Sequence, residues 1–119
     1  MIRVALLAVL LSGCSMIPSF YDDNESSISI DLRYSVNQLD CKQPHGIQVK
    51  EIDQSLKYLE LYTESKGSDD VAKMIAPMRS TVDDFLKRGD DGSVVYCNLK
   101  KKFMETQSAE IAETIMGRF

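Results

Sequence analysis

The sequence predicts an all-α fold: a small up-down four-helix bundle with a kinked third helix and one disulfide. Apolar residues recur at helical spacing in four segments, and short turns containing Gly, Pro or Asp separate those segments. Two of the three cysteines, Cys41 and Cys97, fall where an up-down bundle brings two chain segments to the same end. A chain of 119 residues is long enough for one modest domain.

The first segment, residues 25–41, is compatible with two structures. One apolar set has helical spacing: Ile28, Leu32, Val36 and Leu39. A second set alternates as in a strand: Ile28, Ile30, Leu32, Tyr34 and Val36. Asn24 followed by Glu25 is a good helix start, and the segment is longer than most strands, so we favour a helix. The alternative is an α+β fold with residues 27–36 as a strand.

The next two segments have clearer helical patterns. Residues 47–66 predict a helix that ends before Gly67, and residues 68–88 predict another that begins with Ser68 as its N-cap. Pro77 lies inside the latter segment, but the apolar stripe continues across it, so we expect a kink rather than a break. The two stripes are Val49, Ile52, Leu56 and Leu59, then Val71, Met74, Ile75, Met78, Val82, Phe85 and Leu86.

Residues 93–116 predict the fourth helix, after a turn over residues 90–93. Its expected core stripe is Tyr96, Leu99, Phe103, Ile111 and Ile115, with Cys97 and Met104 beside the same broad face. In the turn before it, Arg88-Gly89-Asp90 spells an adhesion tripeptide, but ordinary helix capping explains it better. We interpret the basic run Lys100-Lys101-Lys102 as a solvated helix face.

The N-terminal residues have the layout of an export signal. Arg3 is followed by an apolar run over residues 4–11 that is too short to span a bilayer, and small residues precede Cys14. Leu11-Ser12-Gly13-Cys14 resembles the lipobox of bacterial, phage or plasmid-encoded lipoproteins, in which the cysteine is lipidated and the chain is cut just before it. An ordinary cleaved signal with an incidental cysteine is the alternative.

The lipobox resemblance implies a division of the chain. Residues 1–13 would be the lipoprotein signal peptide, residues 14–24 the lipidated cysteine and tether, and residues 25–119 the helical periplasmic domain. Ser15, in place of an aspartate, implies the outer membrane under the enterobacterial sorting rule. Multiple acyl chains make such an anchor stable.

Export to an oxidising compartment makes Cys41 and Cys97 a predicted disulfide. Closing the long loop between them contributes about 4 kcal/mol in the chain-entropy model. The prediction has one difficulty: on an ideal first helix, Cys41 falls on the Ile30 and Tyr34 side, away from Leu32 and Leu39. A position in a frayed last turn would remove that difficulty.

No catalytic pattern accompanies these features. His45 is the only histidine and lies between Pro44 and Gly46, so we interpret it as a turn residue without catalytic or metal-binding partners. The sequence has no nucleophile elbow, phosphate-binding loop or metal-spaced cluster, and we expect no enzyme activity, metal or cofactor. The formal net charge of −4 argues against a nucleic-acid partner.

The predicted function is that of an outer-membrane-anchored lipoprotein that acts by protein–protein contact in the cell envelope, as an accessory of assembly, lysis or exclusion. Its partners would be the membrane, through the lipid anchor, and an envelope protein. The alternative is a periplasmic binding or inhibitor module that captures a soluble enzyme or ligand. Its expected surface is either the His45 end or a stripe of methionines, although methionines at this spacing more often fill a core: Met74, Met78 and Met104.

Overall fold

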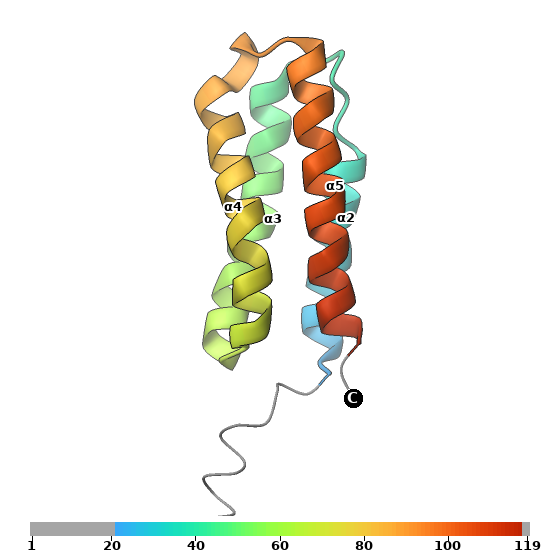
Figure 1. Cartoon of the computed structure of the whole chain (residues 1–119), viewed down its shortest axis with the longest axis vertical. Helices are drawn as coiled ribbons and strands as arrows, with labels where there is room; N and C mark the ends of the chain where they lie inside the picture. Colours follow the sequence, from blue (N-terminus) through green and yellow to red (C-terminus); the bar gives the residue numbers. More distant parts are fainter. Residues whose placement is uncertain (1–20, 118–119) are drawn as a thin grey trace, which may run out of the picture.

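The computed structural model describes residues 21–117, which form one bundle of four long helices (Figure 1). The helices are α2 (Asp23–Asn37), α3 (His45–Lys66), α4 (Asp69–Arg88) and α5 (Val94–Met116), with the short 3-10 helix η1 (Gly89–Asp91) before α5. No strand occurs within the described residues. The all-α prediction is therefore confirmed, and the strand alternative for residues 27–36 is wrong because these residues lie inside α2.

The helices alternate in direction around a square. α2 and α4 each pack against both α3 and α5, as in an up-down bundle. One end of the bundle contains the start of α2, the α3–α4 turn and the end of α5 (Figure 1), and we call it the α3–α4 end. The opposite end contains the α2–α3 loop and η1, and we call it the disulfide end.

The core consists largely of the predicted stripes. Leu32 and Val36 of α2 are fully buried, and Leu39 just beyond the helix is nearly so. The α3 stripe is fully buried. Most of the α4 stripe is buried as well, whereas Met74 and Leu86 are partly buried. Burial of aliphatic side chains at about 25 cal/mol per Å² is the main force that holds such helices together.

Local capping signals set the helix ends. The Asp22 carboxylate accepts from the backbone N–H groups of Asn24 and Glu25, so α2 begins two residues earlier than predicted. Gly67 ends α3 with a positive φ of 76°, and its N–H donates to the carbonyls of Thr63 and Glu64. Ser93 Oγ accepts from the Tyr96 N–H and caps α5.

α4 continues through Pro77 as one helix from Asp69 to Arg88. Proline has no N–H, so the carbonyl of Lys73, four residues earlier, lacks its usual helical partner. Lys73 and Pro77 are both exposed, so this carbonyl lies away from the core. The expectation that the helix does not break at the proline is confirmed.

The predicted core face of α5 is partly wrong. Leu99 and Phe103 are 49% and 47% exposed, whereas Cys97 and Met104, which were expected only beside the core, are fully buried. Two apolar rows compete on this helix, and the row that contains Cys97 also contains Ile111 and Ile115. Burial of that row rotates Leu99 and Phe103 towards solvent.

None of the helices in residues 21–117 combines the length and the apolar character that a bilayer crossing requires.

Candidate functional site

The predicted lipidation and cleavage residues, Leu11, Ser12, Gly13 and Cys14, lie outside the residues that the structure describes. The nearest described element is α2, which begins at Asp23. The polypeptide that follows the predicted anchor therefore joins the bundle at the α3–α4 end (Figure 1).

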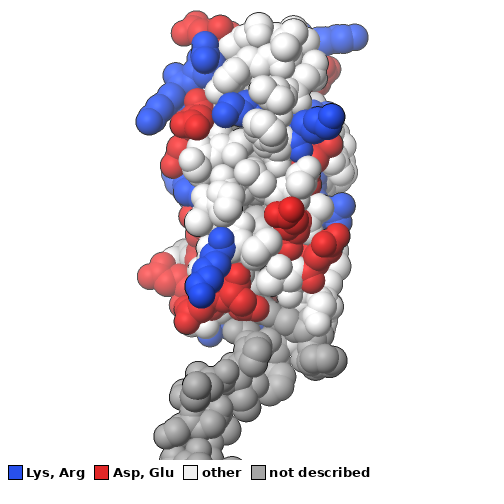
Figure 2. All heavy atoms as spheres, viewed as in Figure 1, with Lys and Arg blue, Asp and Glu red and all other residues white. Residues whose placement is uncertain are grey.

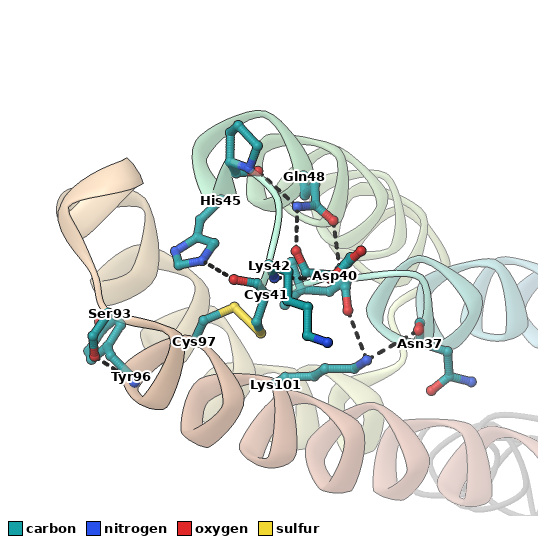
Figure 3. Close-up of a disulfide and its surroundings, with 12 residues drawn as sticks. Asn37, Asp40, Cys41, Lys42, His45, Gln48, Ser93, Tyr96, Cys97 and Lys101 are labelled. Carbon is teal, nitrogen blue, oxygen red and sulfur yellow. Dashed lines mark hydrogen bonds between the residues drawn. A yellow bond between two sulfur atoms is a disulfide. The ribbon is translucent and has the colours of Figure 1, made fainter.

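Cys41 and Cys97 form a disulfide with their Cα atoms 5.6 Å apart (Figure 3). Cys41 lies in the loop after α2, beyond the last helical residue Asn37. The direction of its side chain is therefore not set by the helical repeat of α2. The expected misorientation of Cys41 on an ideal first helix does not arise. The bond joins the α2–α3 loop to the first turns of α5, two segments separated by 56 positions.

His45 is buried, which corrects the interpretation of this residue as an ordinary turn residue. It is the first residue of α3 and is only 5% exposed. Its Nε2 lies 2.9 Å from the carbonyl oxygen of Cys41 (Figure 3). Its ring meets the Phe85 ring edge-on, with the ring centres 5.8 Å apart. The sequence could not reveal this burial, because Phe85 belongs to α4.

Polar contacts fix the α2–α3 loop around the disulfide (Figure 3). Lys101 Nζ donates to the carbonyl oxygen of Leu39 at 2.8 Å and lies 3.4 Å from that of Asn37, where α2 leaves carbonyls without helical partners. The Gln48 side chain bonds to both the N–H and the carbonyl of Asp40. The loop is thereby held to α3 and to α5.

The tripeptide at residues 88–90 and the basic run at residues 100–102 both lie towards the disulfide end. Gly89 occupies the C-cap position of α4, which confirms the capping interpretation of residues 88–90. Asp90 Oδ1 accepts from the Gly46 N–H at 2.7 Å.

The lysines of residues 100–102 point in different directions. Lys101 binds the α2–α3 loop, Lys100 Nζ lies 3.9 Å from an Asp84 oxygen, and Lys102 is exposed.

A charged cluster joins α3 to α4 on the side of the bundle. Arg79 Nη1 lies 2.6 Å from Asp53 Oδ1 and 2.9 Å from Asp83 Oδ1, while Nε and Nη2 both bond to the Glu60 carboxylate. Glu60 is the main cause that raises the Arg79 pKa. Burial acts to raise the pKa of Asp53, but the bonds from Arg79 and Lys57 outweigh it and leave that pKa below 3.8.

A second polar cluster lies at the α3–α4 end, beside the start of α2. The Tyr62 hydroxyl donates to Asp22 Oδ2 at 2.9 Å, and this bond is the main cause that lowers the Asp22 pKa and raises the Tyr62 pKa. The fully buried Glu25 carboxylate accepts from Ser68 Oγ at 3.2 Å, and Lys66 Nζ lies 3.6 Å from it. These contacts fix the first turn of α2 on the α3–α4 turn.

A cleft of about 470 Å³ opens between α3 and α4 near that end. Small and apolar residues line most of it, including Ala72, Ile75 and Ala76, and the Arg79–Glu60 pair also lines it. Thr63 is buried beneath it. Because three carboxylates already bind Arg79, the cleft offers no uncommitted cation to an anionic ligand.

No group of three or more metal-ligating side chains occurs within residues 21–117. Adjacent aspartates occur at several places in the sequence, and their positions in the structure differ. Asp69 and Asp70 begin α4, Asp90 and Asp91 lie in η1, and Asp83 and Asp84 contact different neighbours. Met78 and Met104 are fully buried and Met74 packs against the core, so the described methionines of the predicted stripe are core residues.

No known protein family, curated protein or solved structure matches this chain.

Proposed function

We propose that the protein is a lipid-anchored contact protein of a bacterial cell envelope. Cys14 carries the acyl chains, a short tether follows it, and the helical domain stands at the periplasmic face of the outer membrane. The domain acts by binding another envelope protein as an accessory of assembly, lysis or exclusion. The observation that carries this proposal is the apolar leader that ends at Leu11-Ser12-Gly13-Cys14.

The place where the chain enters the bundle supports the proposal. The chain joins the bundle at the α3–α4 end, where the polar cluster of Asp22, Tyr62 and Glu25 fixes the first turn of α2. The predicted tether ran to residue 24, but α2 begins at Asp23, so about eight residues lie between Cys14 and the helix. They span at most about 28 Å and would hold that end near the membrane. The disulfide end and the sides of the bundle would then face the periplasm.

The charge distribution fits a helical body that stands off the lipid at the end of its tether. The first turns of α2 and α4 each contain two acidic residues, and both turns lie at the α3–α4 end. On the face in Figure 2, acidic side chains gather where α4 begins. An anionic membrane surface repels such an end, which keeps the helical body off the lipid and available to a protein.

The alternative is a module that captures a soluble ligand. Neither of its two expected binding surfaces is exposed, because His45 is buried and the methionine stripe lies in or against the core. The cleft between α3 and α4 is the feature that still favours it.

Fractionation of cells that produce the full-length chain tests the proposal. The wild-type protein should incorporate labelled palmitate and sediment with the outer membrane. Cys14→Ser should lose the label, and Ser15→Asp should keep the label but move to the inner membrane. Ser19→Ala, outside the lipobox, is the matched control and should behave as wild type. An unlabelled wild-type protein, or identical fractionation of Cys14→Ser, would contradict the proposal.

A further inference from the structure

Three exposed apolar residues form a row along the outer face of α5. Val95, Leu99 and Phe103 are 78%, 49% and 47% exposed. They follow one another at intervals of four residues, so they share one helix face and extend over about 12 Å. We call these three residues the α5 stripe. Burial of the opposite row, which contains Cys97 and Met104, leaves this stripe without cover from the described part of the chain.

The backbone beneath the α5 stripe is fixed in place. The disulfide holds Cys97 to the α2–α3 loop, and Lys101 Nζ binds the Leu39 carbonyl oxygen at 2.8 Å. Both residues lie within the length of the stripe but on the inner side of the helix. A surface that is already ordered loses little conformational freedom when a partner binds, which favours affinity.

Basic side chains flank the α5 stripe. On the side towards α4, a hollow of about 420 Å³ is lined by Lys87, Arg88, Lys100, Tyr96 and Asp84. The Arg88 guanidinium lies 4.6 Å from the centre of the Tyr96 ring, and Lys100 Nζ lies 5.5 Å from it. Only one carboxylate, Asp84, lines this hollow. Lys102 is exposed and follows Leu99 by three residues, so it is adjacent to the stripe on the helix surface.

We propose that the α5 stripe and this basic hollow bind an acidic amphipathic segment of another envelope protein. The segment's apolar side chains cover Leu99 and Phe103, and its carboxylates lie over Arg88, Lys100 and Lys102. This assignment rests on the proposed function, because it names the surface through which the anchored protein makes its contact. Charge complementarity decides the occupant.

A second copy of the chain fits this surface poorly. Two copies anchored in the same membrane stand side by side with their α5 helices parallel. Contact through the α5 stripe would then place Lys100 and Lys102 of one copy near the same residues of the other, and like charges oppose such an approach.

Photo-crosslinking in the cells that produce the protein tests this assignment. In one variant of the full-length chain, a photoreactive amino acid replaces Leu99. In a second variant, the matched control, it replaces Leu61, an apolar residue of α3 that is 63% exposed. After irradiation, the crosslinked peptides are identified by mass spectrometry. We expect the Leu99 position to yield an adduct with an acidic amphipathic segment of a different protein, and the Leu61 position to yield none.

The possible outcomes separate this proposal from the proposed function. Protein adducts at Leu61 alone would overturn the surface but leave the contact function standing. Absence of protein adducts at both positions would count against both. An adduct of Leu99 with this chain's own sequence, or with phospholipid, would overturn the assigned partner.

Charge reversal provides a second readout. Lys102→Glu and Arg88→Glu should each reduce the yield of the Leu99 adduct about tenfold. Arg33→Glu reverses an exposed charge on α2 and should leave the yield unchanged. Circular dichroism of each variant checks that the helices are intact. An adduct yield that is independent of the charge at both Lys102 and Arg88 would overturn the proposed acidic partner.

Discussion

Arg79 binds three carboxylates, and nothing in the sequence alone predicts those contacts. It bonds to Asp53 and Glu60 of α3 and to Asp83 of its own helix, and its side chain is 21% exposed. Exposed ion pairs contribute little, but a cation that holds three carboxylates together also prevents their mutual repulsion. Arg79 therefore stabilises the α3–α4 interface.

Substitution of Arg79 by Ala should destabilise the protein by about 1 to 3 kcal/mol, because three carboxylates lose the cation that they share, while Lys57 remains as a partner of Asp53. Urea unfolding followed by circular dichroism measures this loss, and high salt should reduce it. Lys73→Ala, at an exposed position of the same helix, is the matched control and should change stability by less than about 0.5 kcal/mol. Equal stability of both variants would contradict this role.

Asp53 should make stability depend on pH. Its pKa lies below 3.8 in the folded protein, so the folded state binds a proton less readily than the unfolded state. Its contribution to stability is present above the ordinary aspartate pKa of the unfolded chain. The contribution is lost as the pH falls through the lower pKa of the folded protein. Between about pH 5 and pH 2, wild type should lose more stability than Asp53→Asn. Parallel losses in the two proteins, measured by urea unfolding at each pH, would be inconsistent with this pKa shift.

At the scale of elements, helical periodicity was a reliable guide wherever one apolar stripe stood alone. α3 and α4 have such stripes, and every predicted residue of the α3 stripe and most of the α4 stripe are buried. α5 has two apolar rows, and the prediction placed Leu99 and Phe103 in the core. The predicted disulfide could have decided between the two rows. Cys97 bonds to Cys41 and is fully buried, so the row that contains Cys97 faces the core.

The disulfide should contribute about 4 kcal/mol to the free energy of unfolding. We expect the double variant Cys41→Ala/Cys97→Ala to lose most of that amount and to melt at a lower temperature. Hydrogen exchange should show the loss first in the α2–α3 loop and the first turns of α5. A melting temperature equal to that of the oxidised wild type would show that this bond does not stabilise the bundle.

Gly67, in the α3–α4 turn, should be sensitive to substitution. Its φ of 76° is unfavourable for any residue with a Cβ atom, although the space around it is open. Gly67→Ala should therefore cost about 1 kcal/mol through backbone strain alone. Ser65→Ala, at an exposed helical position two residues earlier, serves as the control in the same thermal melts. No difference between these two variants would argue against strain at Gly67.

At the scale of the whole molecule, the bundle joins two features that the sequence presents separately. The predicted anchor leads into the α3–α4 end, and the disulfide lies at the opposite end. The number of helices and the pairing of Cys41 with Cys97 follow from local patterns. The charged clusters around Arg79 and Glu25 do not, because each joins residues far apart in the sequence whose meeting depends on how the helices pack.

The intact mass of the protein, extracted with detergent from the cells that produce it, is the most direct test of the account. We predict a chain that begins at Cys14, with the added mass of a diacylglycerol and a third acyl chain. Reduction should then add two hydrogen atoms, from the Cys41–Cys97 bond. A chain that begins elsewhere, or one that starts at Cys14 with no acyl mass, would contradict the lipid-anchored contact protein proposed here.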